Sequence, residues 1–74
     1  MLIQIIVDIN RIKEVLHEKR KTNKWLSEQL DVNYVTVSRW CTNVYQPNLD
    51  TLRRIAELLD VDIKDLLNST KDNK

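Results

Sequence analysis

The sequence predicts an all-α fold of five short helices, preceded by a short apolar segment with the pattern of an extended segment or β-strand. Apolar residues recur three and four positions apart in successive segments, which is the spacing of one face of an α-helix. Glycine is absent and proline occurs once, which disfavours the tight hairpins of an all-β fold. We expect one domain at residues 8–68, an N-terminal arm at residues 1–7 and a polar tail at residues 69–74.

The N-terminal arm, MLIQIIV, is rich in β-branched residues at alternating positions, and this favours a strand over a helix. It is too short to span a membrane, and it lacks the basic region and cleavage site of a signal peptide. Because an exposed apolar strand promotes aggregation, we expect it to be covered by the same strand of a second copy, antiparallel across a two-fold axis. The alternatives are that it extends the first helix or packs irregularly on its own core.

The first helix is expected from about Asp8 to Arg20, with Asp8 or Asn10 as its start signal. Its apolar face comprises Ile9, Ile12, Val15 and Leu16. We expect this helix to pack across the two helices that follow.

The next two helices are short and each has an N-cap. Thr22 can cap the first and Asn33 the second, because their side-chain oxygens can accept a hydrogen bond from a free N–H in the first turn. The apolar stripes are Leu26 with Leu30 and Val37 with Trp40. Trp40 is therefore a predicted core residue, whereas Trp25 lies off its stripe and packs either on the first helix or against a partner.

The connection Asp31-Val32-Asn33 is short enough to require a sharp turn. Val32 is the one apolar side chain available to fill the angle between the two helices. Asp31 stands where glycine would be easiest, and aspartate visits the left-handed region more readily than most residues. We therefore predict a positive φ at Asp31.

A fourth helix is expected after the loop at residues 42–48, in which Pro47 precedes the candidate caps Asn48 and Asp50. It should run to about Leu59, with an inner face of Leu49, Leu52, Ile55, Ala56 and Leu59. Asp62 can cap a fifth helix with Ile63, Leu66 and Leu67 facing inward.

This ordered set of features resembles the repressor/Cro-like helix-turn-helix family, also called the Xre family, from Arg11 to about Leu67. The resemblance rests on the caps, the turn and the apolar positions above, with Val37-Ser38-Arg39-Trp40 and the closing Val61-Asp62-Ile63. It implies a lambda-repressor-like DNA-binding domain whose recognition helix, after Asn33, lies in the major groove of double-stranded DNA. The chain departs from the family pattern at five positions, with Asp31 and Asn43 for glycine, Asn23 for glutamine, Ser27 for alanine and Cys41 for glutamate.

In this arrangement the outward residues of the recognition helix would contact base edges, namely Tyr34, Val35, Thr36 and Arg39. Arg39 can donate two hydrogen bonds to a guanine, and Val35 and the Thr36 methyl suit a thymine methyl. The resemblance implies phosphate contacts by Asn23, Asn33, Thr42 and Asn43, with Ser38 at the edge. The alternatives are an ion pair of Arg39 with Asp31 or Glu28, a Tyr34 ring folded over the core, and an Asn33 that only caps its helix.

The net charge is only +1, but its distribution is uneven. Residues 11–48 carry a balance of +3 and residues 49–74 a balance of −1. Positive charge gathers at residues 19–21 and at Lys24, which makes Lys21 and Lys24 candidate phosphate contacts. The alternative is a solvated helix end whose basic residues suit the helix dipole.

Other chemistry has little support in the sequence. A single cysteine, Cys41, excludes an internal disulfide, and no metal cluster or cofactor motif is recognisable. His17 and Cys41 lack a third orienting group, so catalysis is not expected. These features predict a non-enzymatic protein of the cytoplasm.

The predicted function is that of a sequence-specific DNA-binding transcriptional regulator, a homodimeric repressor that recognises a pseudo-palindromic operator. One alternative is an antitoxin that binds a toxin protein and represses its own operon. Another is a helical protein-interaction module that keeps the fold without binding DNA.

Overall fold

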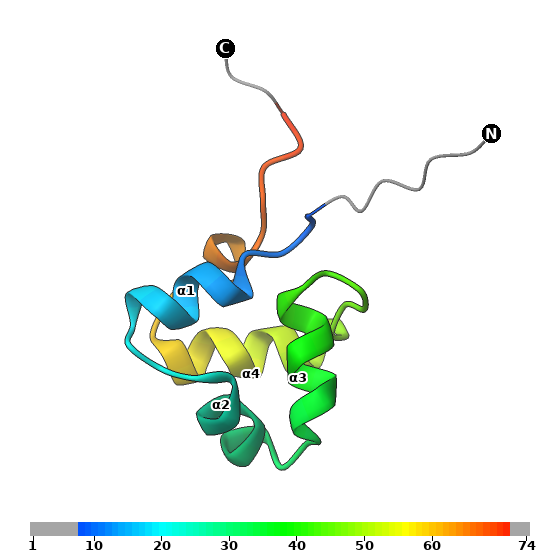
Figure 1. The fold of residues 1–74 in the computed structure, drawn as a ribbon. Coiled ribbons are helices and arrows are strands. Elements are labelled where there is room, and N and C mark those ends of the chain that lie inside the picture. Colours follow the sequence, from blue (N-terminus) through cyan, green and yellow to red (C-terminus); the bar gives the residue numbers. More distant parts are fainter. Residues whose placement is uncertain (1–7, 72–74) are drawn as a thin grey trace, which may run out of the picture.

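The computed structural model describes residues 8–71. Within that range the chain forms four α-helices and one 3₁₀ helix (Figure 1): α1 (Ile12–Glu18), α2 (Asn23–Leu30), α3 (Tyr34–Cys41), α4 (Leu49–Leu59) and η1 (Ile63–Leu66). Four of the five predicted helices are therefore α-helices, and the fifth, expected after Asp62, is a single 3₁₀ turn instead of an α-helix. The strand predicted for residues 1–7 lies outside the described residues.

The fifth segment stays short because the chain turns extended directly after it. Leu67 has extended backbone angles and forms an antiparallel β-bridge with Asn10. Its side chain, predicted to face inward, is exposed. Leu66 is fully buried, and Ile63 is partly buried against the core as expected.

The α1 helix begins later than predicted, at Ile12, because the residues before it bond to the C-terminal segment. The Arg11 N–H donates to the Leu66 carbonyl at 2.8 Å, and the Asn68 N–H donates to the Ile9 carbonyl at 2.9 Å. This pairing holds residues 9–11 outside the helix, and Ile9 is consequently exposed.

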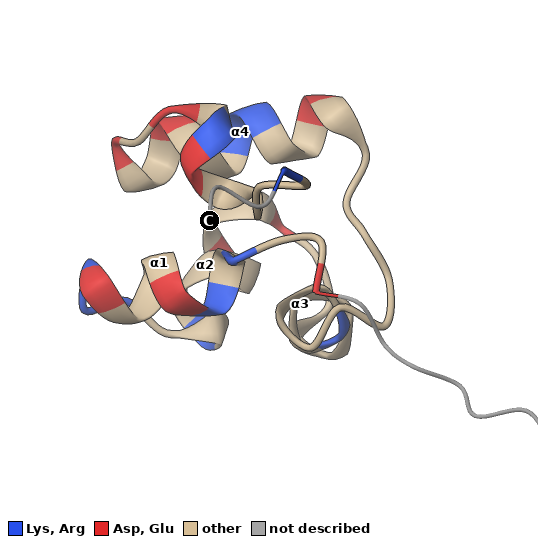
Figure 2. Ribbon diagram, turned by 90° about the horizontal axis from the view of Figure 1, so that it is seen from above, with Lys and Arg blue, Asp and Glu red and all other residues tan. Residues whose placement is uncertain are grey.

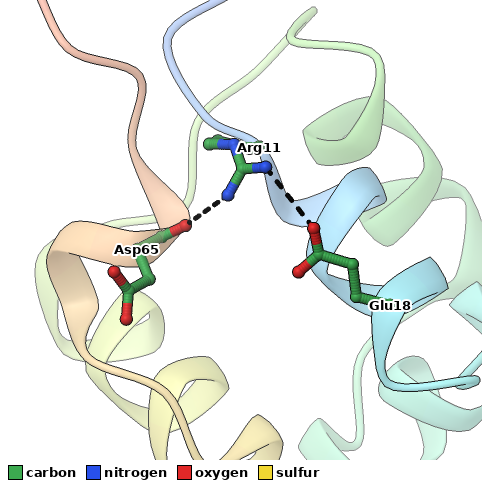
Figure 3. Close-up of polar contacts among 3 residues, drawn as sticks. All are labelled: Arg11, Glu18 and Asp65. Carbon is green, nitrogen blue, oxygen red and sulfur yellow. Dashed lines mark hydrogen bonds and ion pairs between the residues drawn. The ribbon is translucent and has the colours of Figure 1, made fainter.

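The side chain of Arg11 adds a second connection between the two ends of the domain (Figure 3). Its guanidinium lies 3.7 Å from the Glu18 carboxylate and donates to the Asp65 carbonyl at 3.2 Å. It therefore links the end of α1 to η1. Both contacts are solvent-exposed, so each contributes at most about 1 kcal/mol.

One core is shared by all five elements, and its buried apolar side chains include Ile12, Val15, Leu26, Leu30, Val37, Trp40, Leu52, Ile55, Leu59 and Leu66. Leu49 was predicted to join this face but is 80% exposed. It is the first residue of α4, directly after the cap Asn48, whose side chain accepts from Thr51 N. In that turn Leu52 reaches the core and Leu49 does not.

This difference predicts unequal effects of two substitutions in one helical turn. We expect Leu49→Ser to change the free energy of unfolding by less than about 0.5 kcal/mol, because the side chain is already in solvent. Leu52→Ala should cost about 2–5 kcal/mol, since it leaves a cavity in the core. Urea denaturation at low protein concentration measures both, and an equal loss from the two variants would contradict the exposure of Leu49.

Candidate DNA-binding surface

The α2 and α3 helices each begin at a cap that the local sequence supplies. The Thr22 hydroxyl oxygen accepts from Trp25 N at 3.0 Å, and the Asn33 carboxamide oxygen accepts from Val35 N at 2.7 Å. Asp31 has φ 56°, which confirms the predicted left-handed residue. Val32 packs partly buried against the core. The two helices therefore form the predicted helix-turn-helix, with the turn visible between α2 and α3 in Figure 1.

The α3 helix separates its residues into an inner and an outer face. Val37, Trp40 and Cys41 are buried, which confirms Trp40 as a core residue. On the outer face Tyr34 and Val35 are each about half exposed, at 53% and 51%, and Arg39 is exposed while Thr36 is partly buried. Of the four predicted base-reading side chains, Tyr34, Val35 and Arg39 are therefore accessible and Thr36 is partly so, and none of the larger ones folds into the core.

Arg39 is the one charged residue of α3 (Figure 2). Within residues 8–71 the ion pairs are Arg11–Glu18 and Arg53–Glu57, so neither Asp31 nor Glu28 holds Arg39. Its guanidinium carbon instead lies 5.6 Å from the ring centroid of Tyr45, in the loop after α3. Sequence reasoning did not single out Tyr45, whose only signal was an aromatic residue in a polar loop.

At the N-terminal ends of α2 and α3, two predicted phosphate contacts are oriented by bonds within the chain. The Asn23 carboxamide oxygen accepts from the Cys41 thiol at 3.3 Å, and the Asn33 oxygen is taken by its capping bond. These bonds use the oxygen of each amide and leave its nitrogen, which is the donor that a phosphate needs, out of the bond.

The predicted contacts at the other end of α3 have internal roles. The Thr42 hydroxyl lies 3.1 Å from the Ser38 carbonyl, to which it donates. The Asn43 oxygen accepts from the N–H groups of Ile9 and Asn10 and from the Gln46 amide, and the Asn43 amide donates to the Asn10 carbonyl. Asn43 has φ 62°, so it both turns the chain and fastens residues 9–10 to the end of α3.

The basic residues near the start of α2 are exposed. Lys21 Nζ lies 4.8 Å from the centroid of the Trp25 ring, and that ring is partly buried against the core. A groove of about 390 Å³ between α1 and the start of α2 is lined by Lys13, Glu14, Leu16, His17, Lys21 and Asn23. Lys13 and Lys21 carry positive charges and Glu14 a negative one, so the part of the groove beside Asn23 has a balance of +1.

Cys41 does not have the properties of a nucleophile. Burial raises the pKa of its thiol to about 11, an effect that nearby Lys13 opposes and Glu14 reinforces. The thiolate, which is the reactive form, is therefore scarce at neutral pH. No three histidine, cysteine or acidic side chains gather at a metal-binding distance in residues 8–71. Over the same residues, each helix is too short or too polar to span a bilayer.

Comparison with known proteins gives three findings. The family model described as the Cro/C1-type helix-turn-helix DNA-binding domain matches residues 11–72. A crystal structure of a protein from Bacteroides fragilis, to which DNA binding has been ascribed, is 55% identical in sequence, with a TM-score of 0.80. The match covers 81% of this chain and 97% of that one. No curated protein sequence is significantly similar to this chain.

Proposed function

The chain belongs to the Cro/C1-type helix-turn-helix DNA-binding family, and from this premise we propose that it is a sequence-specific transcriptional regulator with α3 as its recognition helix. The observation that carries the proposal is that α3 has one buried face and one exposed face. Its inner side chains complete the core, while its outer face leaves Arg39 and the first-turn side chains accessible. A helix of this kind can enter the major groove without losing its support.

The proposed base contacts are made by Tyr34, Val35, Thr36 and Arg39, with Arg39 donating to guanine O6 and N7. The proposed phosphate contacts are the amides of Asn23 and Asn33, the hydroxyl of Ser38 and the ammonium groups of Lys21 and Lys24. The Thr42 hydroxyl would join them by exchanging its bond to the Ser38 carbonyl for one to a phosphate. Asn43 supports the site from inside, since its side chain bonds to residues 9–10 and Gln46.

We further propose that the protein acts as a homodimer on a pseudo-palindromic operator and represses transcription in the cytoplasm by occupying a promoter. The dimer is supported by the short length of the recognition helix, because one such helix contacts only a few base pairs. Two copies related by a two-fold axis double the contacted sequence, with half-sites about 10 base pairs apart. Occupancy alone then blocks transcription.

Selection from a random DNA duplex library at low salt tests this proposal. We expect enrichment of a pseudo-palindrome whose half-sites lie about one helical turn apart. Enrichment of a single asymmetric site would contradict the dimer and leave DNA recognition standing. If no sequence is enriched, the regulator should be abandoned in favour of a protein-interaction module, and a toxin-like protein partner becomes the next candidate.

Substitution of the basic residues near α2 should weaken DNA binding regardless of sequence. We expect Lys21→Ala and Lys24→Ala each to lower affinity for selected and unrelated duplexes alike, because each removes a charge that displaces phosphate counterions. The slope of log K against log salt should fall by about one for each variant. Lys64→Ala on η1 is the control, and a Lys21→Ala slope equal to that of the control would remove Lys21 from the interface.

A further inference from the structure

The loop after α3 folds back onto Arg39. The Arg39 carbonyl accepts from the backbone N–H of Val44 at 2.9 Å and of Tyr45 at 3.3 Å, and the Thr42 hydroxyl lies 3.3 Å from it. The positive φ of Asn43 reverses the chain at this point. The position of Tyr45 relative to Arg39 is therefore set by the backbone as well as by the side chains.

The Arg39 side chain is exposed and forms no ion pair within residues 8–71, so its hydrogen-bonding groups are available. The guanidinium carbon is 5.6 Å from the Tyr45 ring centroid, within the range of a cation–π interaction. The N–H donors of a guanidinium lie in its plane, and aromatic rings interact with its face. A ring contact can therefore fix the direction of the side chain while its edge still donates to a base.

An exposed arginine without such a contact samples many rotamers and loses that freedom on binding. Tyr45 is itself 58% exposed, so little of the core depends on its ring. Its neighbour Val44 is equally exposed, at 57%, and bonds to the same carbonyl through its backbone. The chain thus offers two adjacent exposed side chains, of which Tyr45 is the aromatic one that lies beside the guanidinium.

We propose that Tyr45 is a positioning residue that holds the Arg39 guanidinium in the orientation with which it recognises a guanine. This inference rests on the proposed function, in which Arg39 contacts a base. It adds a specificity-determining side chain outside α3, acting through Arg39 rather than on DNA directly.

The test compares discrimination between the selected site and the same site with the Arg39-contacted guanine replaced. An exposed cation–π contact corresponds to a factor of about two to five, so Tyr45→Ala should reduce the discrimination ratio by that factor. Tyr45→Phe should retain it, because phenylalanine keeps the aromatic face. The matched control Val44→Ala should leave the ratio unchanged, and circular dichroism verifies that each variant is folded.

A double-mutant cycle separates positioning from direct contact. In the Arg39→Ala background, we expect Tyr45→Ala to cause no further loss of affinity or discrimination. A further loss there would overturn the proposal, because Tyr45 would then contact DNA itself. Unchanged or increased discrimination by the single Tyr45→Ala variant would also overturn it and leave the proposed function intact. A wild-type protein that enriches no duplex overturns both.

Discussion

Replacement of Arg39 by alanine is expected to remove most of the preference for one base pair in each half-site. A bidentate arginine–guanine contact discriminates against other bases by about 1–3 kcal/mol, which corresponds to about 5- to 150-fold in the ratio of dissociation constants. Arg39→Lys should recover little of this ratio, because an ammonium group lacks the planar pair of donors. Fluorescence anisotropy on the selected duplex and its single-base variant measures the ratio.

The matched control for this experiment is Arg54→Ala. Arg54 is also exposed but lies on α4, so its loss removes the same charge from the protein outside the proposed interface. If Arg39→Ala keeps the wild-type discrimination ratio, base recognition has to be reassigned to Tyr34 or Val35. A loss of affinity that is equal for every duplex would reduce Arg39 to a phosphate contact.

The second large effect is expected from Asn10, which is buried at 3% exposure. Its amide donates to the Trp40 carbonyl at 2.9 Å and to the Gln46 side-chain oxygen at 2.7 Å, and its oxygen accepts from Ile12 N at 3.0 Å. Asn10→Ala would leave the buried N–H of Ile12 without a partner and would take one of two donors from the Trp40 carbonyl, which also accepts from Asn43 N. We therefore expect a loss of about 2–4 kcal/mol in unfolding free energy.

Urea denaturation followed by tryptophan fluorescence measures this loss. Asn68→Ala is the control, because its amide makes one exposed bond to the Asp8 carbonyl, and it should cost less than about 1 kcal/mol. Asn10→Asp should destabilise strongly as well, since a carboxylate would face the Trp40 carbonyl and the Gln46 oxygen without a proton to donate. An Asn10→Ala variant as stable as Asn68→Ala would contradict a structural role for this network.

The features that were predicted correctly depend on residues close together in the sequence. Thr22, Asn33 and Asn48 cap the helices that follow them, because a capping bond spans only two or three residues. The positive φ of Asp31 followed from the length of its turn. The buried position of Trp40 followed from its spacing with Val37.

The errors occurred where helical spacing continued beyond the end of the helix. Ile9 and Leu67 both continue an apolar pattern, yet they lie outside the helices, in two segments that pair with each other. Ile9 accepts from Asn68 N, and Leu67 forms a β-bridge with Asn10. Leu49 matches the α4 stripe but lies in a first turn that extends past the core. Periodicity identifies which residues share a face of a helix, but it does not show where the core surface against which that face packs comes to an end.

By itself, therefore, the sequence determined the helix-turn-helix, its caps and the outward face of α3, because these depend on bonds and spacings within one or two helical turns. Only the tertiary structure decided that Asn43 secures residues 9–10 and that Asn10 joins α1 to the end of α3. Those contacts link residues 30 or more positions apart, so no local pattern encodes them. The tertiary structure also decided that Tyr45 approaches Arg39, because this contact depends on the path of the loop, which the hydrogen bonds of Asn43 fix.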